Sequence, residues 1–195
     1  LEFHRTAVSF GEILEMLPSV PQMRAKAPLR IAVIGCGRWG PQHIRVFSSL
    51  PGAKVVLAVD SDPARIKRVQ SLYPWLKCAR DFKSALARKA FDAAVIATPT
   101  STHFELARLC LDAGAHVLCE KPLCMSGIQG VVLVGLARKR RRILMSGHVF
   151  LFNAGIVKLK DLIGSGELGR IQVLSSARTN LGPIRSDANV AFDLA

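Results

Sequence analysis

Hydrophobic and polar positions divide the chain from Leu29 onward into two kinds of segment. The first kind is short and apolar nearly throughout, and it covers residues 29–35, 53–60, 91–99, 115–122 and 142–149. The second kind carries apolar residues at helical spacing, and it covers residues 41–50, 63–73, 101–114 and 126–140. Apolar strands that alternate with amphipathic helices are typical of a parallel sheet covered on both faces. The pattern therefore predicts an α/β fold with a doubly wound parallel sheet over residues 29–150.

The segments on either side of this region differ from it. Near the start, Phe10, Ile13 and Leu14 fall at helical spacing until Pro18 ends the pattern, so residues 1–28 are predicted to form a partly helical arm. The last residues, "NVAFDLA", alternate apolar and small or acidic positions as a strand does. An acidic residue in such a strand needs a partner, because a buried unpaired carboxylate is costly.

Composition narrows the class of protein. Half of the 195 residues are hydrophobic and 21% are charged, which is the balance of a globular domain rather than a disordered chain. The apolar runs are too short to span a bilayer, and "LEFHRTAVSF" lacks the apolar centre of a signal peptide. Five scattered cysteines without a Cys-x-x-Cys pair indicate reduced thiols in a cytoplasmic protein and no metal site.

The formal charge of +13 favours anionic ligands. Its densest cluster is "RKRRR", Arg138 to Arg142, which has two interpretations. Cations suit the C-terminal end of a helix, and a basic cluster can also bind a polyanion. No aromatic residues interleave with these arginines, so we favour the helix end and regard nucleic-acid binding as the weaker hypothesis.

A glycine loop follows the first predicted strand. In "GCGRWG", Gly35, Gly37 and Gly40 have the G-x-G-x-x-G spacing and stand between a strand and a helix. The first glycine permits a tight turn, the second lets the backbone approach a pyrophosphate, and the third lets helix and strand pack closely. The alternative is a tight strand–helix turn without a ligand. The context favours dinucleotide binding at the helix N-terminus.

An acidic residue ends the second predicted strand, twenty residues after Gly40. Asp60 in "AVDSD" can bind both ribose hydroxyls of an adenosine and repel a 2′-phosphate, which favours NAD as the cofactor. Arg65 and other nearby cations leave NADP open as the alternative.

Two further strand ends carry polar residues at the same edge of the sheet. "ATPTSTH" contains Thr98, Pro99 and His103, and this histidine is either an ordinary helix residue or one that faces the cofactor. "EKP" contains Glu120, Lys121 and Pro122. A lysine here is either solvated or placed to hold or transfer a proton, and Pro122 is a candidate for a cis peptide bond.

Taken together, five motifs resemble those of the Gfo/Idh/MocA oxidoreductases. They are "AVIGCGRWG", "AVDSDP", "ATPTSTHFELA", "EKPL" and "GHVFLFNAGIVKLKDLIGSGELGRI", and they occur in the family's order from about Leu29 to the end. The stretch "SARTNLGPIRSDANVAFDLA" looks like the subgroup of UDP-N-acetylglucosamine 3-dehydrogenases.

The resemblance implies a role for each matching residue. The cofactor-binding set would be Gly35, Gly37, Arg38, Trp39, Gly40, Asp60, Thr98, Pro99, His103 and Glu120, with Lys121 catalytic. His148 and Asn153 would border the substrate where two domains meet. Arg178, Asn180 and Arg185 would face a sugar nucleotide, or are ordinary surface residues.

The resemblance also implies a second domain, an α+β unit with an open antiparallel sheet and a role in homo-oligomer formation. Residues 151–195 would be its incomplete beginning, with a helix at about 154–165 and a strand at about 170–178. Asp193 matches a catalytic Asp that the family follows, four positions later, with a His. That His would fall beyond Ala195, so the resemblance predicts a sequence truncated before its general base.

The resemblance implies an NAD-dependent sugar dehydrogenase, with a sugar or nucleotide sugar as substrate. The chain as given is expected to bind NAD without efficient turnover. The alternatives are a nucleotide-binding module that has lost catalysis and, with least support, a nucleic-acid-binding protein.

Overall fold

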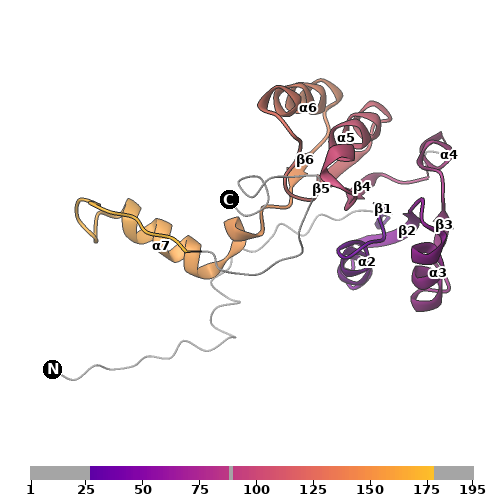
Figure 1. Ribbon diagram of the computed structural model, residues 1–195, viewed down its shortest axis with the longest axis horizontal. Helices are drawn as coiled ribbons and strands as arrows, with labels where there is room; N and C mark the ends of the chain where they lie inside the picture. The colour runs from indigo at the N-terminus through magenta and orange to yellow at the C-terminus, as the bar shows by residue number, and fades with distance from the viewer. Residues whose placement is uncertain (1–26, 88–89, 178–195) are drawn as a thin grey trace.

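A computed structural model describes residues 27–87 and 90–177 (Figure 1). These residues contain a six-stranded sheet in the order β3-β2-β1-β4-β5-β6. The paired strands are parallel: β1 (Leu29–Ile34), β2 (Ala53–Val59), β3 (Lys77–Ala79), β4 (Ala93–Ile96), β5 (His116–Cys119) and β6 (Leu144–Ser146). The order reverses between β1 and β4, as it does in doubly wound dinucleotide-binding sheets. The predicted fold class is confirmed.

Helices cover both faces of this sheet. They are α2 (Gly40–Ser48), α3 (Pro63–Leu72), α4 (Phe82–Ala87), α5 (His103–Asp112) and α6 (Gly127–Arg140). Ile31 and Val33 of β1 belong to one core cluster with residues of α2 and α3, whereas Ala32 and Ile34 belong to a second cluster with residues of α4, α5 and α6. The alternation of side chains along β1 thus supplies both cores, which is why its sequence is apolar at every buried position.

Two elements of this domain were not predicted from the sequence. β3 is a three-residue strand at the edge of the sheet, and α4 has six residues. Segments this short carry too few apolar positions to show a period. None of the described helices is both long and apolar enough to cross a bilayer.

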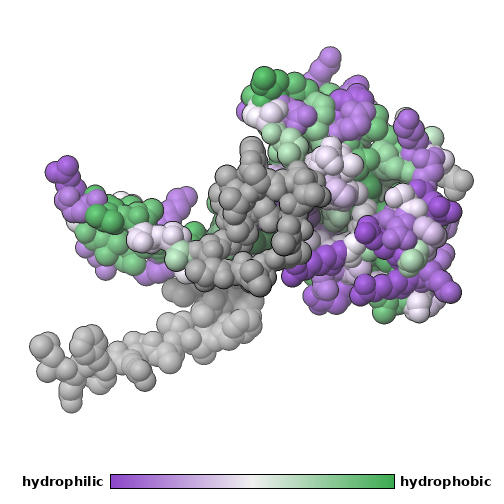
Figure 2. Space-filling model, in the orientation of Figure 1, coloured by the Kyte–Doolittle hydropathy of each residue, from purple (hydrophilic) through white to green (hydrophobic). Residues whose placement is uncertain are grey.

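The chain after β6 leaves the sheet. A short 3₁₀ helix, η2 (Val149–Phe152), leads to α7 (Ala154–Gly164), which matches the predicted helix and extends away from the domain (Figure 1). No residue of α7 is buried, and Figure 2 shows apolar side chains on its surface.

The predicted strand at 170–178 is wrong over its described part, because residues 170–177 form no strand. Strand backbone needs a paired neighbour, and no described residues pair with this segment, where Val173 and Leu174 are 83% and 77% exposed. The predicted N-terminal helix and the strand at Asp193 lie outside the described residues.

The five cysteines are free thiols, as the sequence indicated. Cys36, Cys110 and Cys119 are buried, whereas Cys78 and Cys124 are partly exposed. Burial, with the nearby Asp60 carboxylate as a second cause, raises the pKa of Cys36 to about 12. Burial alone raises the pKa of Cys110 to about 12 as well. Only the thiolate form reacts with alkylating reagents, so these buried thiols are protected in two ways.

We therefore expect iodoacetamide at about pH 8 to modify Cys124 and Cys78 in the folded protein before any buried cysteine. Peptide mass spectrometry over time would follow each site. Addition of urea should equalise the five rates, because unfolding removes the burial that raises the pKa. Rapid modification of Cys110 in native buffer would contradict the described packing.

Candidate functional site

The glycine loop leaves β1 at the carboxyl edge of the sheet, beside the start of the loop after β4. Gly35 has φ +93°, and a Cβ there would lie 2.5 Å from the carbonyl oxygen of Ala97. A Cβ on Gly40 would lie 2.0 Å from the carbonyl oxygen of Gly35. Neither position tolerates a side chain, so the loop can turn back and start α2 only with glycine at both.

Gly37 is different, because the space in front of it is open. A Cβ there would meet only Nη1 of Arg65, at 3.8 Å, which is ordinary van der Waals contact. The fold therefore does not itself require glycine at this position. α2 starts at Gly40, and its N-cap residue Trp39 makes no side-chain capping hydrogen bond. Open backbone at Gly37 in front of a helix N-terminus fits a pyrophosphate, which needs close backbone approach and N–H donors.

Asp60 links the glycine loop to the start of α3. Its carboxylate accepts the backbone N–H of Cys36 at Oδ2 (2.7 Å) and that of Asp62 at Oδ1 (2.9 Å). Nη1 of Arg65 lies 3.6 Å from Oδ2, and the Asp60 side chain is only 5% exposed. The residue predicted to bind ribose thus also holds the loop that would bind the phosphates.

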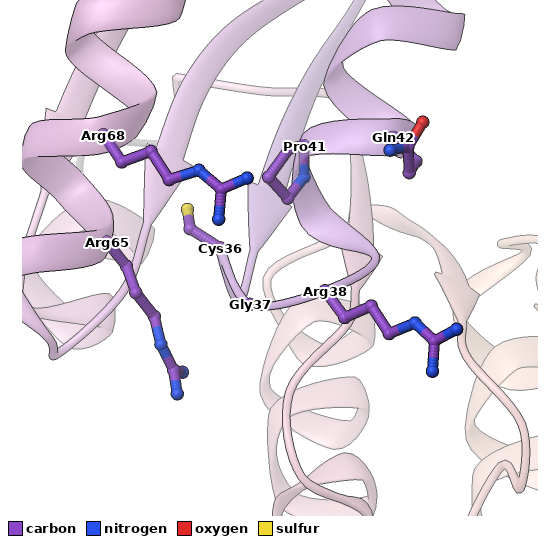
Figure 3. A pocket seen from close by; sticks show the side chains of 7 residues that line it. All are labelled: Cys36, Gly37, Arg38, Pro41, Gln42, Arg65 and Arg68. Atoms are coloured by element: carbon purple, nitrogen blue, oxygen red, sulfur yellow. The ribbon is translucent and has the colours of Figure 1, made fainter. Parts of the chain in front are cut away.

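A cavity of about 530 Å³ opens between this loop and α3 (Figure 3). Its lining residues come from the glycine loop, α2 and α3, and they are Cys36, Gly37, Arg38, Pro41, Gln42, Arg65 and Arg68. Three are arginines and none is acidic, so the cavity favours an anion such as a phosphate. Figure 3 shows Arg68 pointing from α3 toward Cys36, whereas Arg38 extends from the loop in the direction away from α3.

The turn after β5 brings Glu120 and Lys121 to the same edge. The Lys121–Pro122 peptide bond is cis, as the sequence suggested. Nε2 of His43, on α2, lies 2.8 Å from Oε1 of Glu120, and both side chains are at least four-fifths buried. Burial of Glu120 favours its neutral form, but its hydrogen bond with His43 and the nearby charges outweigh this and hold the pKa of the carboxyl below its usual range.

His103 occupies the space between two loops of this edge. It begins α5 and is 1% exposed. Its Nδ1 lies 2.8 Å from the carbonyl oxygen of Pro122, and its Nε2 lies 2.9 Å from that of Thr98. The side chain is thus buried between two carbonyls of the protein. The sequence left open whether His103 is an ordinary helix residue or faces the cofactor, and both of its ring nitrogens contact protein atoms.

The remaining predicted residues are more scattered. The backbone N–H of His148 donates to Ser146 (2.8 Å), and Asn153 caps α7 by accepting the N–H of Ile156 (3.2 Å). Asp193, Arg178, Asn180 and Arg185 lie outside the described residues. Among the described residues, no three His, Cys, Asp or Glu side chains gather in a way that could hold a metal ion.

Sequence reasoning missed His43, Gln42 and Arg68. Their only sequence signal is their position on helices that start at the predicted cofactor edge. Their contacts with Glu120 and with the cavity join segments far apart in the chain.

We expect Asp60→Asn to lower the free energy of unfolding by about 1–3 kcal/mol, because the amide nitrogen of Asn would face one of two backbone donors, the buried N–H of Cys36 or the partly buried N–H of Asp62. Urea unfolding followed by circular dichroism would measure the change. Asp62→Asn is the matched control: Asp62 caps α3 from an exposed position, where Asn performs equally, so its effect should stay below about 0.5 kcal/mol. Equal effects of the two substitutions would contradict the role of Asp60.

Known proteins of similar sequence and structure cover the same region. An inositol 2-dehydrogenase of Rhodococcus erythropolis is 36% identical over 154 residues, which are 78% of this chain and 44% of that protein. The crystal structure of a myo-inositol 2-dehydrogenase from Lactobacillus plantarum superposes with a TM-score of 0.68 at 27% identity, covering 74% of this chain and 43% of that one. This chain therefore spans less than half the length of these relatives.

A third comparison is the WlbA dehydrogenase from Bordetella pertussis, whose crystal structure was solved in complex with NADH and UDP-GlcNAcA. It gives a TM-score of 0.70 at 26% identity, covering 75% of this chain and 42% of that one. Residues 29–148 match the model of the Gfo/Idh/MocA family, described as an oxidoreductase family with an NAD-binding Rossmann fold. With the glycine loop, Asp60 and the Glu120–Pro122 turn at one edge of a sheet of this topology, the chain belongs to the Gfo/Idh/MocA oxidoreductases.

Proposed function

We propose that this chain is the NAD-binding part of a dehydrogenase that oxidises a hydroxyl group of a sugar or cyclic polyol. The observation that carries the proposal is the meeting of a phosphate-binding loop, Asp60 and Lys121 at the carboxyl ends of β1, β2 and β5. Ligands of open α/β sheets bind at this edge, beside the point where the strand order reverses. The relatives named above act on, or were crystallised with, polyhydroxylated rings.

Different residues at the carboxyl edge of the sheet would bind different parts of the cofactor. The open backbone at Gly37 and the start of α2 would receive the pyrophosphate, with Arg38 and Arg65 adding positive charge. Asp60 supports NAD over NADP, since a 2′-phosphate would approach its carboxylate. Arg65 lies between Asp60 and the cavity, so it is the residue through which NADP would also be accepted.

Bound NAD supplies the hydride acceptor. The protein's part is to orient the alcohol and manage its proton. Lys121 would donate a hydrogen bond to the alcohol oxygen and stabilise negative charge that develops there. Asp193 would orient the general base of the complete site.

For the substrate we propose a polyhydroxylated ring, and a nucleotide sugar as the narrower form of that proposal. The UDP-GlcNAcA complex of the WlbA dehydrogenase supports the narrower form, whereas the inositol 2-dehydrogenases support a ring without a nucleotide. His148 and Asn153 would border the ring. Arg178, Asn180 and Arg185 would contact a diphosphate.

We expect Gly37→Val to raise the Kd for NADH at least about tenfold, a free-energy change of about 1.4 kcal/mol, without a change in Tm. The side chain has room in the fold but would occupy the approach of the pyrophosphate. Fluorescence titration with NADH gives the Kd, and thermal melting gives the Tm. Gly52→Val is the control, since Gly52 has open space around it and lies before β2, at the opposite edge. Unchanged affinity in the Gly37 variant would argue against the proposed cofactor site.

We expect Lys121→Met to lower kcat by about a hundredfold or more in the whole protein while the Kd for NADH stays within about twofold. NAD reduction with myo-inositol and with UDP-N-acetylglucosamine-type substrates would be recorded by absorbance. Wild-type turnover with neither substrate, with NADH binding intact, would instead favour the nucleotide-binding module that has lost catalysis.

A further inference from the structure

The turn that carries Lys121 is held from two different helices by histidine side chains. β5 ends at Cys119, and the N–H of Glu120 still donates to the carbonyl of Ile96 on the neighbouring strand (2.9 Å). After that point the chain leaves the sheet and continues to Pro122, which has no N–H to donate. The sheet therefore fixes Glu120, and other contacts must fix the backbone beyond it.

His43 provides the first of these contacts. It is the fourth residue of α2, the helix that follows the glycine loop. Its Nε2 is 2.8 Å from Oε1 of Glu120. The other carboxylate oxygen of Glu120 lies 3.3 Å from the backbone N–H of Lys121. Gly147 lies behind the carboxylate, where a Cβ would be 3.2 Å from Oε2. The Glu120 side chain thus connects α2 to the Lys121 backbone and has little room to move.

His103 provides the second contact. Its Nδ1 meets the carbonyl of Pro122 (2.8 Å), and its Nε2 meets the carbonyl of Thr98 (2.9 Å). The ring therefore joins the loop after β4 to the far side of the Lys121 turn. His103 is 1% exposed, and a neutral imidazole has one N–H. Replacing it by an apolar residue would therefore leave one of these two carbonyls without its donor in a buried site.

We propose that His43 and His103 are positioning residues that hold the Glu120–Pro122 turn, and with it Lys121, against the nicotinamide half of the bound cofactor. The inference rests on the proposed function. Each histidine lies on a helix that starts at the cofactor edge, α2 after the glycine loop and α5 after the loop at Thr98. The pair therefore transmits the position of both cofactor loops to the lysine turn. His103 acts in this way through its two carbonyl contacts rather than by direct contact with NAD.

The experiment compares two ligands that share their adenosine and pyrophosphate. ADP-ribose also keeps the second ribose and lacks only the nicotinamide ring, so the ratio of its Kd to that of NADH reports what this ring contributes to binding. Isothermal titration of the 195-residue chain would give this ratio for wild type, His43→Leu, His103→Leu and the conservative variants His43→Gln and His103→Gln. The glutamine amide keeps N–H donors in a similar place.

We expect each leucine variant to lower the ratio about fivefold, within the range of one net hydrogen bond, while the Kd for ADP-ribose changes less than about twofold. Glutamine at position 43 should restore most of the ratio. If His103→Leu does not fold, His103→Gln and the two His43 variants still decide the question.

His116→Gln is the matched control. His116 begins β5 at the opposite end of the strand, where its Nδ1 accepts the N–H of Ile143 (2.9 Å). Loss of this hydrogen bond should lower the Tm and leave the ratio of the Kd for ADP-ribose to the Kd for NADH unchanged. A ratio that stays constant in the His43 and His103 variants, or a wild-type ratio near one, would overturn the positioning role. Failure of the wild type to bind either ligand would instead overturn the proposed function itself.

Discussion

The cofactor edge of this domain depends on the buried carboxylate of Asp60. Two backbone N–H groups, from Cys36 in the glycine loop and Asp62 before α3, donate to its two oxygens. A buried carboxylate is stable only when such donors satisfy it, and the donors in turn need the carboxylate. The turn after β1 and the turn after β2 are therefore one unit. The cavity lined by three arginines opens between the glycine loop and α3, which this unit connects.

A second unit lies across the switch in strand order. Gly35 packs against the carbonyl of Ala97, so the loop after β1 and the loop after β4 approach without intervening side chains. His103 extends this contact to the turn after β5, and His43 closes the connection back to α2. Polar contacts between loops at one sheet edge are well suited to carry function, because the strands beneath them supply a rigid frame.

Much of this arrangement could be predicted from the sequence. Five of the six strands and the helices between them follow from apolar runs and helical spacing, and parallel strands place their carboxyl ends at one edge. The glycine spacing and the acidic residue after β2 predict the cofactor loop. β3 and α4 were missed because they are too short to show a period, and the strand predicted at 170–178 was wrong because a strand requires a partner that apolar alternation alone does not supply.

The division between the two levels has a physical cause. Local hydrophobic periods predict the fold class and place the candidate lysine at the end of a strand. The glycine loop needs backbone conformations that only certain residues adopt. All three can therefore be predicted from the sequence. The histidine contacts join residues 77 and 19 positions apart, at His43 with Glu120 and at His103 with Pro122. Such pairs exist only after β1, β4 and β5 have aligned, since the sheet brings their loops within hydrogen-bond distance. Which of the predicted residues contact one another at this edge was therefore decided by the tertiary structure.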